Sequence, residues 1–202
     1  ILPKIIFSNK INIEGKENLK TILEQNEKVI FIGIHQSNWE ILLPSIDKLG
    51  ISVGGIYRHI NNPYINKLIL KIRNKCILSK KSFYTPKGKQ SAKDILEGIN
   101  QNLSMILLID QKDSAGENIN FFDNPVKTQI GFIKIARKYK MNIIPVQNIR
   151  EKNYFTLKIH KPINIESKNY LDKEIMAELH KLIEGWIEKD PINWFLQHNR
   201  FG

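Results

Sequence analysis

The sequence predicts an α/β fold in which a mixed, mostly parallel central sheet is flanked by helices. Apolar, strand-like runs alternate with amphipathic, helix-like segments along the chain, as expected for parallel strands joined by helices. The last two strand-like segments follow each other closely, as in an antiparallel hairpin. Hydrophobic residues make up 42% of the 202 residues, which is enough for the core of one ordinary domain. We find no linker or internal repeat, and therefore expect a single domain over residues 1–202.

The first half of the chain shows this alternation clearly. The expected elements are, in order, helix 16–26, strand 29–34, helix 38–49, strand 51–57, helix 62–73 and a short strand at 76–79. The apolar run "VIFIGI" at 29–34 is typical of a buried strand, and Ser37 or Asn38 can cap the helix that follows. Pro63 suits the first turn of its helix, where its missing N–H costs no hydrogen bond.

The second half continues in the same way. The expected elements are helix 89–102, strand 104–110, a polar loop at 111–118, helix 128–140, strands 142–151 and 154–165, and helix 172–190. The segment "KQSAKDILEGINQN" is amphipathic, whereas "SMILLID" is a continuous apolar run. The two late strands are close enough in the sequence to pair as a hairpin, so the sheet is expected to be mixed.

Positive charge is concentrated in one part of the chain. The formal net charge is +11, and no acidic residue occurs between Asp47 and Asp94. That interval contains all of the excess, in the form of Lys48, Arg58, Lys67, Lys71, Arg73, Lys75, Lys80, Lys81, Lys87, Lys89 and Lys93. Lysine-rich composition with solvated side chains is one interpretation. The other is a surface that meets phospholipid headgroups, a phosphorylated substrate, an acidic protein or nucleic acid.

The expected helix 62–73 lies inside this interval and is amphipathic. Ile65, Leu68, Ile69 and Ile72 fall on one face, and Lys67, Lys71 and Lys75 fall on another. Such a helix can pack its apolar face on the core and leave its lysines in water. A basic amphipathic helix can also lie on a membrane surface.

Several classes of protein are not favoured. A single cysteine, Cys76, allows no internal disulfide, and no run of about 18 apolar residues predicts a membrane-spanning helix. There is no phosphate loop, no G-x-G-x-x-G and no C-x2-C, and the histidines show no metal-ligand spacing. We therefore expect neither a cofactor nor a metal. Nucleic-acid binding would need a recognisable module or stacking platform, and neither is present.

The segment "GIHQSNWEIL" at 33–42 carries the strongest chemical signal. His35 follows a buried strand, and Glu40 falls in the first turn of the next helix, an H-x4-E spacing. In α/β proteins ligands bind beyond the carboxyl ends of strands, where both residues would lie. We expect Glu40 to hold one ring nitrogen of His35 while the other removes a proton from a substrate hydroxyl.

Five segments in the same order resemble one family. They are "HQSNWE" (35–40), "YRHINNPYINKLILKIR" (57–73), "PKGKQSAKDILEGINQNLSMILLIDQ" (86–111), "FFDNPVKTQIGFIKIARKYKMNIIPV" (121–146) and "DPINWFLQHNRF" (190–201). They are similar to the motifs of the late acyltransferases of lipid A biosynthesis, the lauroyl and myristoyl transferases, within the lysophospholipid acyltransferase-like families. The departures are Ser37 and Asp123 where glycine is usual, and Leu196 and Asn199 where Trp and Arg are usual.

The resemblance implies a glycerolipid acyltransferase-like fold and a reaction. A fatty acyl group would pass from acyl carrier protein to a hydroxyl of a phosphorylated lipid A precursor, in lipopolysaccharide biosynthesis. The protein would act at the cytoplasmic face of the bacterial inner membrane. The family's N-terminal membrane helix has no counterpart in this sequence, so we expect a peripheral protein or one anchored by a segment absent here.

The site residues can be assigned by combining the resemblance with their chemistry. His35 is the expected general base and Glu40 its partner. Substrate contacts are expected from Asn38, Arg58, Arg73, Asp110 and Gln111. Arg58 follows a strand and can stabilise the oxyanion or bind an acceptor phosphate, or it can form a surface salt bridge. Asp110 ends a buried strand, where it can order the site or simply initiate a turn.

Other readings of the sequence remain open. The same His35–Glu40 pair can serve another glycolipid or a lysophospholipid acceptor. A non-catalytic remnant that binds anionic lipid or nucleic acid would also explain the charge.

Overall fold

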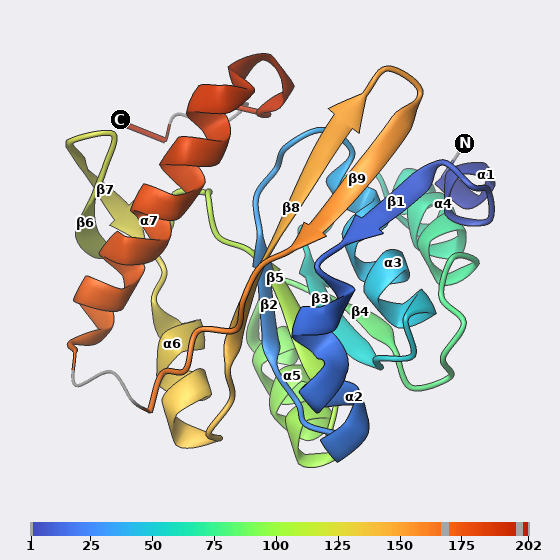
Figure 1. The fold of residues 1–202 in the computed structure, drawn as a ribbon, viewed down its shortest axis with the longest axis horizontal. Helices are drawn as coiled ribbons and strands as arrows, with labels where there is room; N and C mark the ends of the chain where they lie inside the picture. The colour runs from blue at the N-terminus through green and yellow to red at the C-terminus, as the bar shows by residue number, and fades with distance from the viewer. Residues whose placement is uncertain (1, 167–169, 197–199, 202) are drawn as a thin grey trace.

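The computed structural model describes residues 2–166, 170–196, 200 and 201, and confirms the predicted mixed, mostly parallel α/β fold (Figure 1). Its strands are β1 (Ile11–Glu14), β2 (Ile30–Gly33), β3 (Val53–Tyr57), β4 (Phe83–Pro86), β5 (Ser104–Leu108), β6 (Glu117–Phe121), β7 (Asn124–Thr128), β8 (Ile143–Glu151) and β9 (Tyr154–Ile159). Its α-helices are α1 (Leu2–Ile6), α2 (Lys20–Gln25), α3 (Leu42–Lys48), α4 (Pro63–Asn74), α5 (Lys89–Asn100), α6 (Gly131–Lys138) and α7 (Asp172–Lys189). Short 3-10 turns are η1 (Lys16–Leu19), η2 (Trp39–Ile41) and η3 (Pro191–Asn193).

In the described chain the central sheet has seven strands in the order β1-β9-β8-β2-β5-β3-β4. The pair β8–β9 is antiparallel, as the expected hairpin requires, and the other neighbours are parallel. The carboxyl ends of β2, β5, β3 and β4 therefore meet at one edge of the sheet. This edge is where ligands bind in α/β folds.

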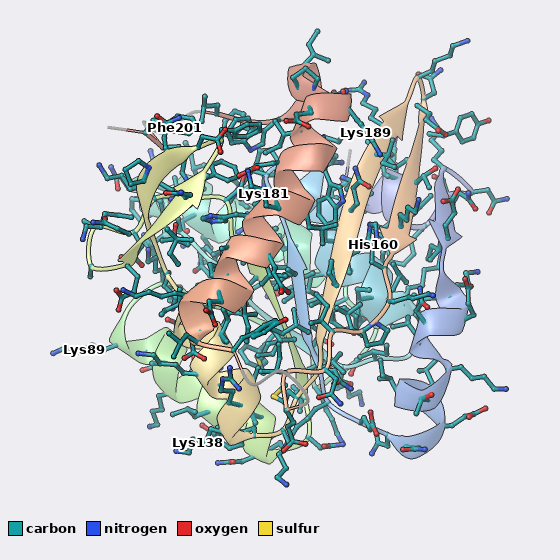
Figure 2. All side chains as sticks on the ribbon, turned by 60° about the vertical axis from the view of Figure 1, so that its left-hand side comes forward. Lys89, Lys138, His160, Lys181, Lys189 and Phe201 are labelled. Atoms are coloured by element: carbon teal, nitrogen blue, oxygen red, sulfur yellow. The ribbon has the colours of Figure 1, made fainter. Side chains whose placement is uncertain are left out.

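Two apolar layers hold the sheet between helices. Ile30 and Ile32 of β2 face α5, α6 and α7, whereas Phe31 between them faces α2 and α3. Side chains of a strand alternate between its two faces, so a continuous apolar run is what burial on both sides requires. Figure 1 shows α6 and α7 on one side of the sheet and α2 and α3 on the other, and Figure 2 shows side chains filling the space between α7 and the sheet.

Three local expectations were wrong. The segment 76–79 is not a strand. The strand that pairs with β3 at this edge of the sheet is β4, which begins later, at Phe83. The strand β1 at the sheet edge was not expected. The hairpin β6–β7 was also not expected: β6 begins at Glu117, inside the loop expected at 111–118, and β7 ends at Thr128, where helix 128–140 was expected to begin.

The hairpin β6–β7 shows why glycine is usual in the family at position 123, where this chain has Asp123. Phe122 and Asp123 form its turn with φ angles of 48° and 58°. Positive φ at both central residues is the geometry of a tight hairpin turn, where glycine is easiest to place. The glycine usual at position 123 therefore has a backbone reason. Phe121, just before the turn, is fully buried in the core.

Candidate active site

His35 and Asp110 come together because β2 and β5 are adjacent parallel strands. Gly33 lies opposite Leu108, and the N–H of Ile109 donates to the carbonyl of Gly33 at 3.0 Å. Continuing both strands in this register brings His35 beside Asp110. The Asp110 carboxylate lies 2.7 Å from Nδ1 of the His35 ring and accepts the His35 backbone N–H at 3.0 Å.

The Asp110 carboxylate is charged and sheltered. Its side chain is 2% exposed, and that of His35 is 14% exposed. Burial alone would raise the pKa of Asp110, but hydrogen bonds from His35 and Trp194 and the charge of the ring outweigh it and lower the pKa below its ordinary value. An ionised Asp110 holds a proton on the nearer ring nitrogen, Nδ1.

The opposite ring nitrogen of His35 is therefore a proton acceptor. The side-chain amide nitrogen of Gln111 lies 3.2 Å from Nε2 of His35, in position to donate to it. Gln111 is exposed, so this nitrogen is at the open side of the site. An imidazole with a carboxylate behind one ring nitrogen and its other ring nitrogen at the open side is the arrangement of a general base.

Glu40 does not take the role that the sequence suggested for it. Its carboxylate accepts two hydrogen bonds from Arg73, at 2.7 Å from Nε and 2.5 Å from Nη2, and the partner of the His35 ring is Asp110 instead. The physical reason is strand order, which puts Asp110 next to His35, while α4 brings Arg73 to the η2 turn. The predicted Glu40–His35 contact is thus corrected.

The Glu40–Arg73 pair is a two-point ion pair packed between rings. Arg73 lies over the rings of Tyr57 and Tyr84, at 5.3 and 5.5 Å from their centroids. Burial opposes the charge on Arg73, but the hydrogen bonds and charge of Glu40 outweigh it, and the pKa of Arg73 is raised. Bidentate pairing fixes geometry as well as charge. This pair therefore anchors α4 to the start of the helix that follows His35.

A C-terminal segment completes the site, although no residue of it was among the site residues expected from the sequence. Trp194 donates from its indole nitrogen to Asp110 at 2.9 Å, and Phe195 donates its N–H to the His35 carbonyl at 2.7 Å. Trp39 stands edge-on to the His35 ring at 5.2 Å and packs on Phe195 at 5.1 Å. The aromatic-rich run "NWFLQHNRF" was the available signal. Residues 197–199 within it, including Asn199, lie outside the described residues.

Three more residues are near the site in different ways. Ser37 and Asn38 closely follow His35 in the sequence, and Arg58 directly follows Tyr57 at the end of β3. Ser37 has a φ of 55°, a left-handed conformation that explains why glycine is usual there. Asn38 is half-buried at the N-cap position of η2, and its side chain makes no capping bond. Arg58 is exposed directly after β3, at the same edge of the sheet as Asp110.

Two further findings concern the part of the chain that the structure describes. No group of three or more His, Cys, Asp or Glu side chains there is arranged to hold a metal ion. None of the helices there combines the length and the apolar character needed to cross a bilayer.

Comparison with known proteins gives a family match over nearly the whole chain. A sequence model described as bacterial lipid A biosynthesis acyltransferase matches residues 2–202. No curated protein matched the sequence. Among solved structures, the 1-acyl-sn-glycerophosphate (LPA) acyltransferase PlsC from Thermotoga maritima is similar, with 18% sequence identity and a TM-score of 0.49, over 93% of this chain and 76% of that one.

Proposed function

Because the chain belongs to the bacterial lipid A biosynthesis acyltransferase family, we propose that it transfers a fatty acyl group from acyl carrier protein to a hydroxyl of a lipid A precursor. The family makes the protein an acyltransferase that uses an acyl donor and a lipid acceptor. The observation that carries the finer proposal is the His35–Asp110 pair, at 2.7 Å, with Nε2 of His35 toward the open side of the site. That pair can activate a hydroxyl without an enzyme nucleophile.

The reaction follows from this geometry. Nε2 of His35 takes the proton of the acceptor hydroxyl as the oxygen attacks the thioester carbonyl carbon. The new imidazolium is stabilised by the ionised Asp110 behind it. The tetrahedral intermediate then collapses, the C–S bond breaks, and the proton on His35 passes to the leaving thiolate. An ester of the acceptor and a free thiol on the carrier protein result.

The remaining predicted residues have supporting roles in this proposal. Gln111 orients the imidazole ring of His35 so that Nε2 is directed toward the substrate. Asn38 contacts the acceptor beside His35. Arg58 binds negative charge, either the acceptor phosphate or the developing oxyanion. Glu40 positions Arg73, and through it α4, rather than the ring of His35.

The acceptor determines where the protein works. A lipid A precursor is a membrane lipid, so the protein would act as a peripheral protein at the cytoplasmic face of the bacterial inner membrane. Acyl carrier proteins are acidic, and the segment between Asp47 and Asp94, which has eleven basic residues and no acidic one, offers charge of the opposite sign.

The test is a transfer assay with defined donors and acceptors. Labelled acyl groups on acyl carrier protein or on coenzyme A are offered with either a lipid A precursor or a lysophospholipid. The proposal expects transfer from the carrier protein to the lipid A precursor. Transfer only to the lysophospholipid would instead assign a glycerolipid acceptor, and no transfer to any acceptor would contradict an active enzyme.

The catalytic assignment is tested in the same assay with His35→Ala and Glu40→Ala. Loss of the general base in His35→Ala should lower kcat on the order of 10²–10⁴-fold. Glu40→Ala should lower it less, since Glu40 acts through Arg73. Circular dichroism checks that both variants fold. Near-normal turnover in a folded His35→Ala variant would show that the assignment is wrong.

A further inference from the structure

The helix α4 is turned so that its apolar residues do not all face the core. Its buried side carries the polar Asn66, 8% exposed, and the ion-paired Arg73. Asn66 accepts the N–H of Ile60, and Arg73 reaches Glu40, so these two residues tie the helix to the protein body. Asn62 and Pro63 fix its start, where the Asn62 side chain accepts the N–H groups of residues 64 and 65.

The outward side of α4 consequently exposes large apolar side chains. Tyr64 is 84% exposed, Leu68 is 56% exposed and Ile65 is 46% exposed. Tyr64 and Leu68 are one helical turn apart and lie on the same face. This burial pattern contradicts the simpler expectation of an apolar face packed on the core with lysines opposite. An aromatic and two aliphatic side chains stand in water instead.

Lysines flank these apolar residues on the same outward side. Lys67, Lys71 and Lys75 are all exposed, and within the described part of the chain no carboxylate pairs with them. The surrounding sequence from 48 to 93 has no acidic residue to neutralise them.

We propose that α4 docks the protein on the surface of an anionic lipid bilayer, with Tyr64, Ile65 and Leu68 in the headgroup–acyl boundary and Lys67, Lys71 and Lys75 on lipid phosphates. Exposed apolar residues flanked by unpaired lysines are what a helix lying in the plane of a membrane interface presents. An acidic protein would match the lysines, but a tyrosine and two aliphatic side chains protruding from a convex helix suit a deformable apolar layer better.

The docked helix would also be connected to the catalytic site. Arg73 leaves the opposite side of α4 and binds Glu40, five residues after His35. Contact of α4 with the bilayer would then hold the His35 edge of the sheet at a fixed distance from the lipid surface. This positional consequence rests on the proposed function, whereas docking itself does not.

The experiment is vesicle co-sedimentation with the full chain, and it contains neither acyl donor nor acceptor. Vesicles are either pure phosphatidylcholine or an equal mixture of phosphatidylcholine and phosphatidylglycerol. We compare the wild type, the triple variant K67Q/K71Q/K75Q and the double variant Y64S/L68S. The control K134Q/K138Q/K140Q removes the same charge from α6 and the residues just after it, on the opposite side of the molecule from α4 (Figure 1), and Lys138 is labelled in Figure 2.

The wild type should bind the phosphatidylglycerol vesicles and bind phosphatidylcholine much more weakly. The α4 lysine variant should lose roughly 100-fold in partitioning to the anionic vesicles. Each lysine at an anionic surface raises this partitioning about fivefold, and the variant removes all three. The Y64S/L68S variant should lose on the order of tenfold. The α6 control should retain near-wild-type binding.

Each other outcome overturns the proposal. Equal losses in the α6 control and the α4 variant would mean that only net charge matters. Unchanged vesicle binding with lost binding to acyl carrier protein, measured in parallel, would assign α4 to the carrier protein. Because the variants change exposed residues and are checked by circular dichroism, loss of folding is separable. Absence of acyl transfer in the separate assay would leave the vesicle result unaffected.

Discussion

Two histidines in this protein have the same hydrogen-bonding pattern but opposite surroundings. Both have Nδ1 directed at an oxygen, that of Asp110 for His35 and the Asn120 carbonyl for His180, each at 2.7 Å. Both have Nε2 near a nitrogen donor, Gln111 for His35 and Arg200 for His180. The first ring sits at the open edge of the sheet, whereas the second is fully buried.

The difference lies in the charge of the groups around each ring. The group behind the His35 ring is the carboxylate of Asp110, whose pKa is lowered. At His180, burial lowers the pKa to about 4, the Asn120 carbonyl partly opposes this, and the charge of Arg200 lowers the pKa further. A carboxylate partner and an open nitrogen make a histidine useful as a base, whereas a cation and burial make it a structural group.

The C-terminal segment connects the two regions. Trp194 donates to Asp110 and packs on Phe121, with ring centroids 6.0 Å apart. Phe121 also contacts His180 at 4.9 Å and lies under Arg200. The buried Arg200 donates to the Lys127 carbonyl and to Thr128 of β7. The structural cluster around His180 therefore holds the segment that supports the His35–Asp110 pair.

The largest effect on this comparison should come from Asp110→Asn. The amide keeps the shape but removes the charge that stabilises an imidazolium at His35, so kcat should fall on the order of 10²–10⁴-fold. The KM for the acceptor should change little, because the substituted group lies behind the ring. The transfer assay measures both. If Asp110→Asn keeps wild-type kcat while Glu40→Gln abolishes it, the roles of the two carboxylates are reversed.

The second prediction concerns His180 and acid stability. With a folded pKa of about 4 against an ordinary 6.5, the unfolded chain binds the extra proton between these pH values. The neutral His180 ring therefore makes its full contribution to the free energy of unfolding above pH 6.5. That contribution is lost as the pH falls through 4, and the total loss is about 3 kcal/mol. Urea unfolding of the wild type at several pH values between 6.5 and 4 gives the slope of the free energy of unfolding against pH.

His180→Gln should be less stable at neutral pH and should show a shallower fall in stability between pH 6.5 and 4. The matched control is His59→Gln, at an exposed histidine, which should keep the wild-type slope. The charged groups that face His180 are Arg200 and Glu184. Equal slopes in the wild type and His180→Gln would mean that the imidazole is not the titrating group.

The smallest effect is expected from Trp194→Phe, which tests the link between the regions. The change removes one hydrogen bond to the Asp110 carboxylate and keeps an aromatic ring against Phe121. A bond to a charged group contributes about 1.5 kcal/mol at the lower end, so kcat should fall about tenfold. As a positioning residue, Trp194 should affect kcat and leave KM unchanged. A parallel rise in KM, or a large loss of stability, would indicate a packing role only.

Much of the fold could be predicted from the sequence because its signals are local. The apolar runs at β2 and β5, the periodic helices and the closely spaced strands of the β8–β9 hairpin appear within short windows. The hairpin β6–β7 was missed although Ile119 and Phe121 alternate with polar residues, because its strands are short and its turn contains no glycine. The location of His35 at a strand end was likewise a local inference.

The sequence by itself determined the family, the α/β class and the histidine that stands at the end of β2. Only the tertiary structure decided which carboxylate meets that histidine, since Asp110 is 75 residues away and adjacent solely through the order of the strands. It also decided that Glu40 binds Arg73, that Trp194 joins the site and that α4 turns Tyr64 and Leu68 outward. Local propensity depends on neighbours along the chain, whereas these contacts depend on how distant elements pack.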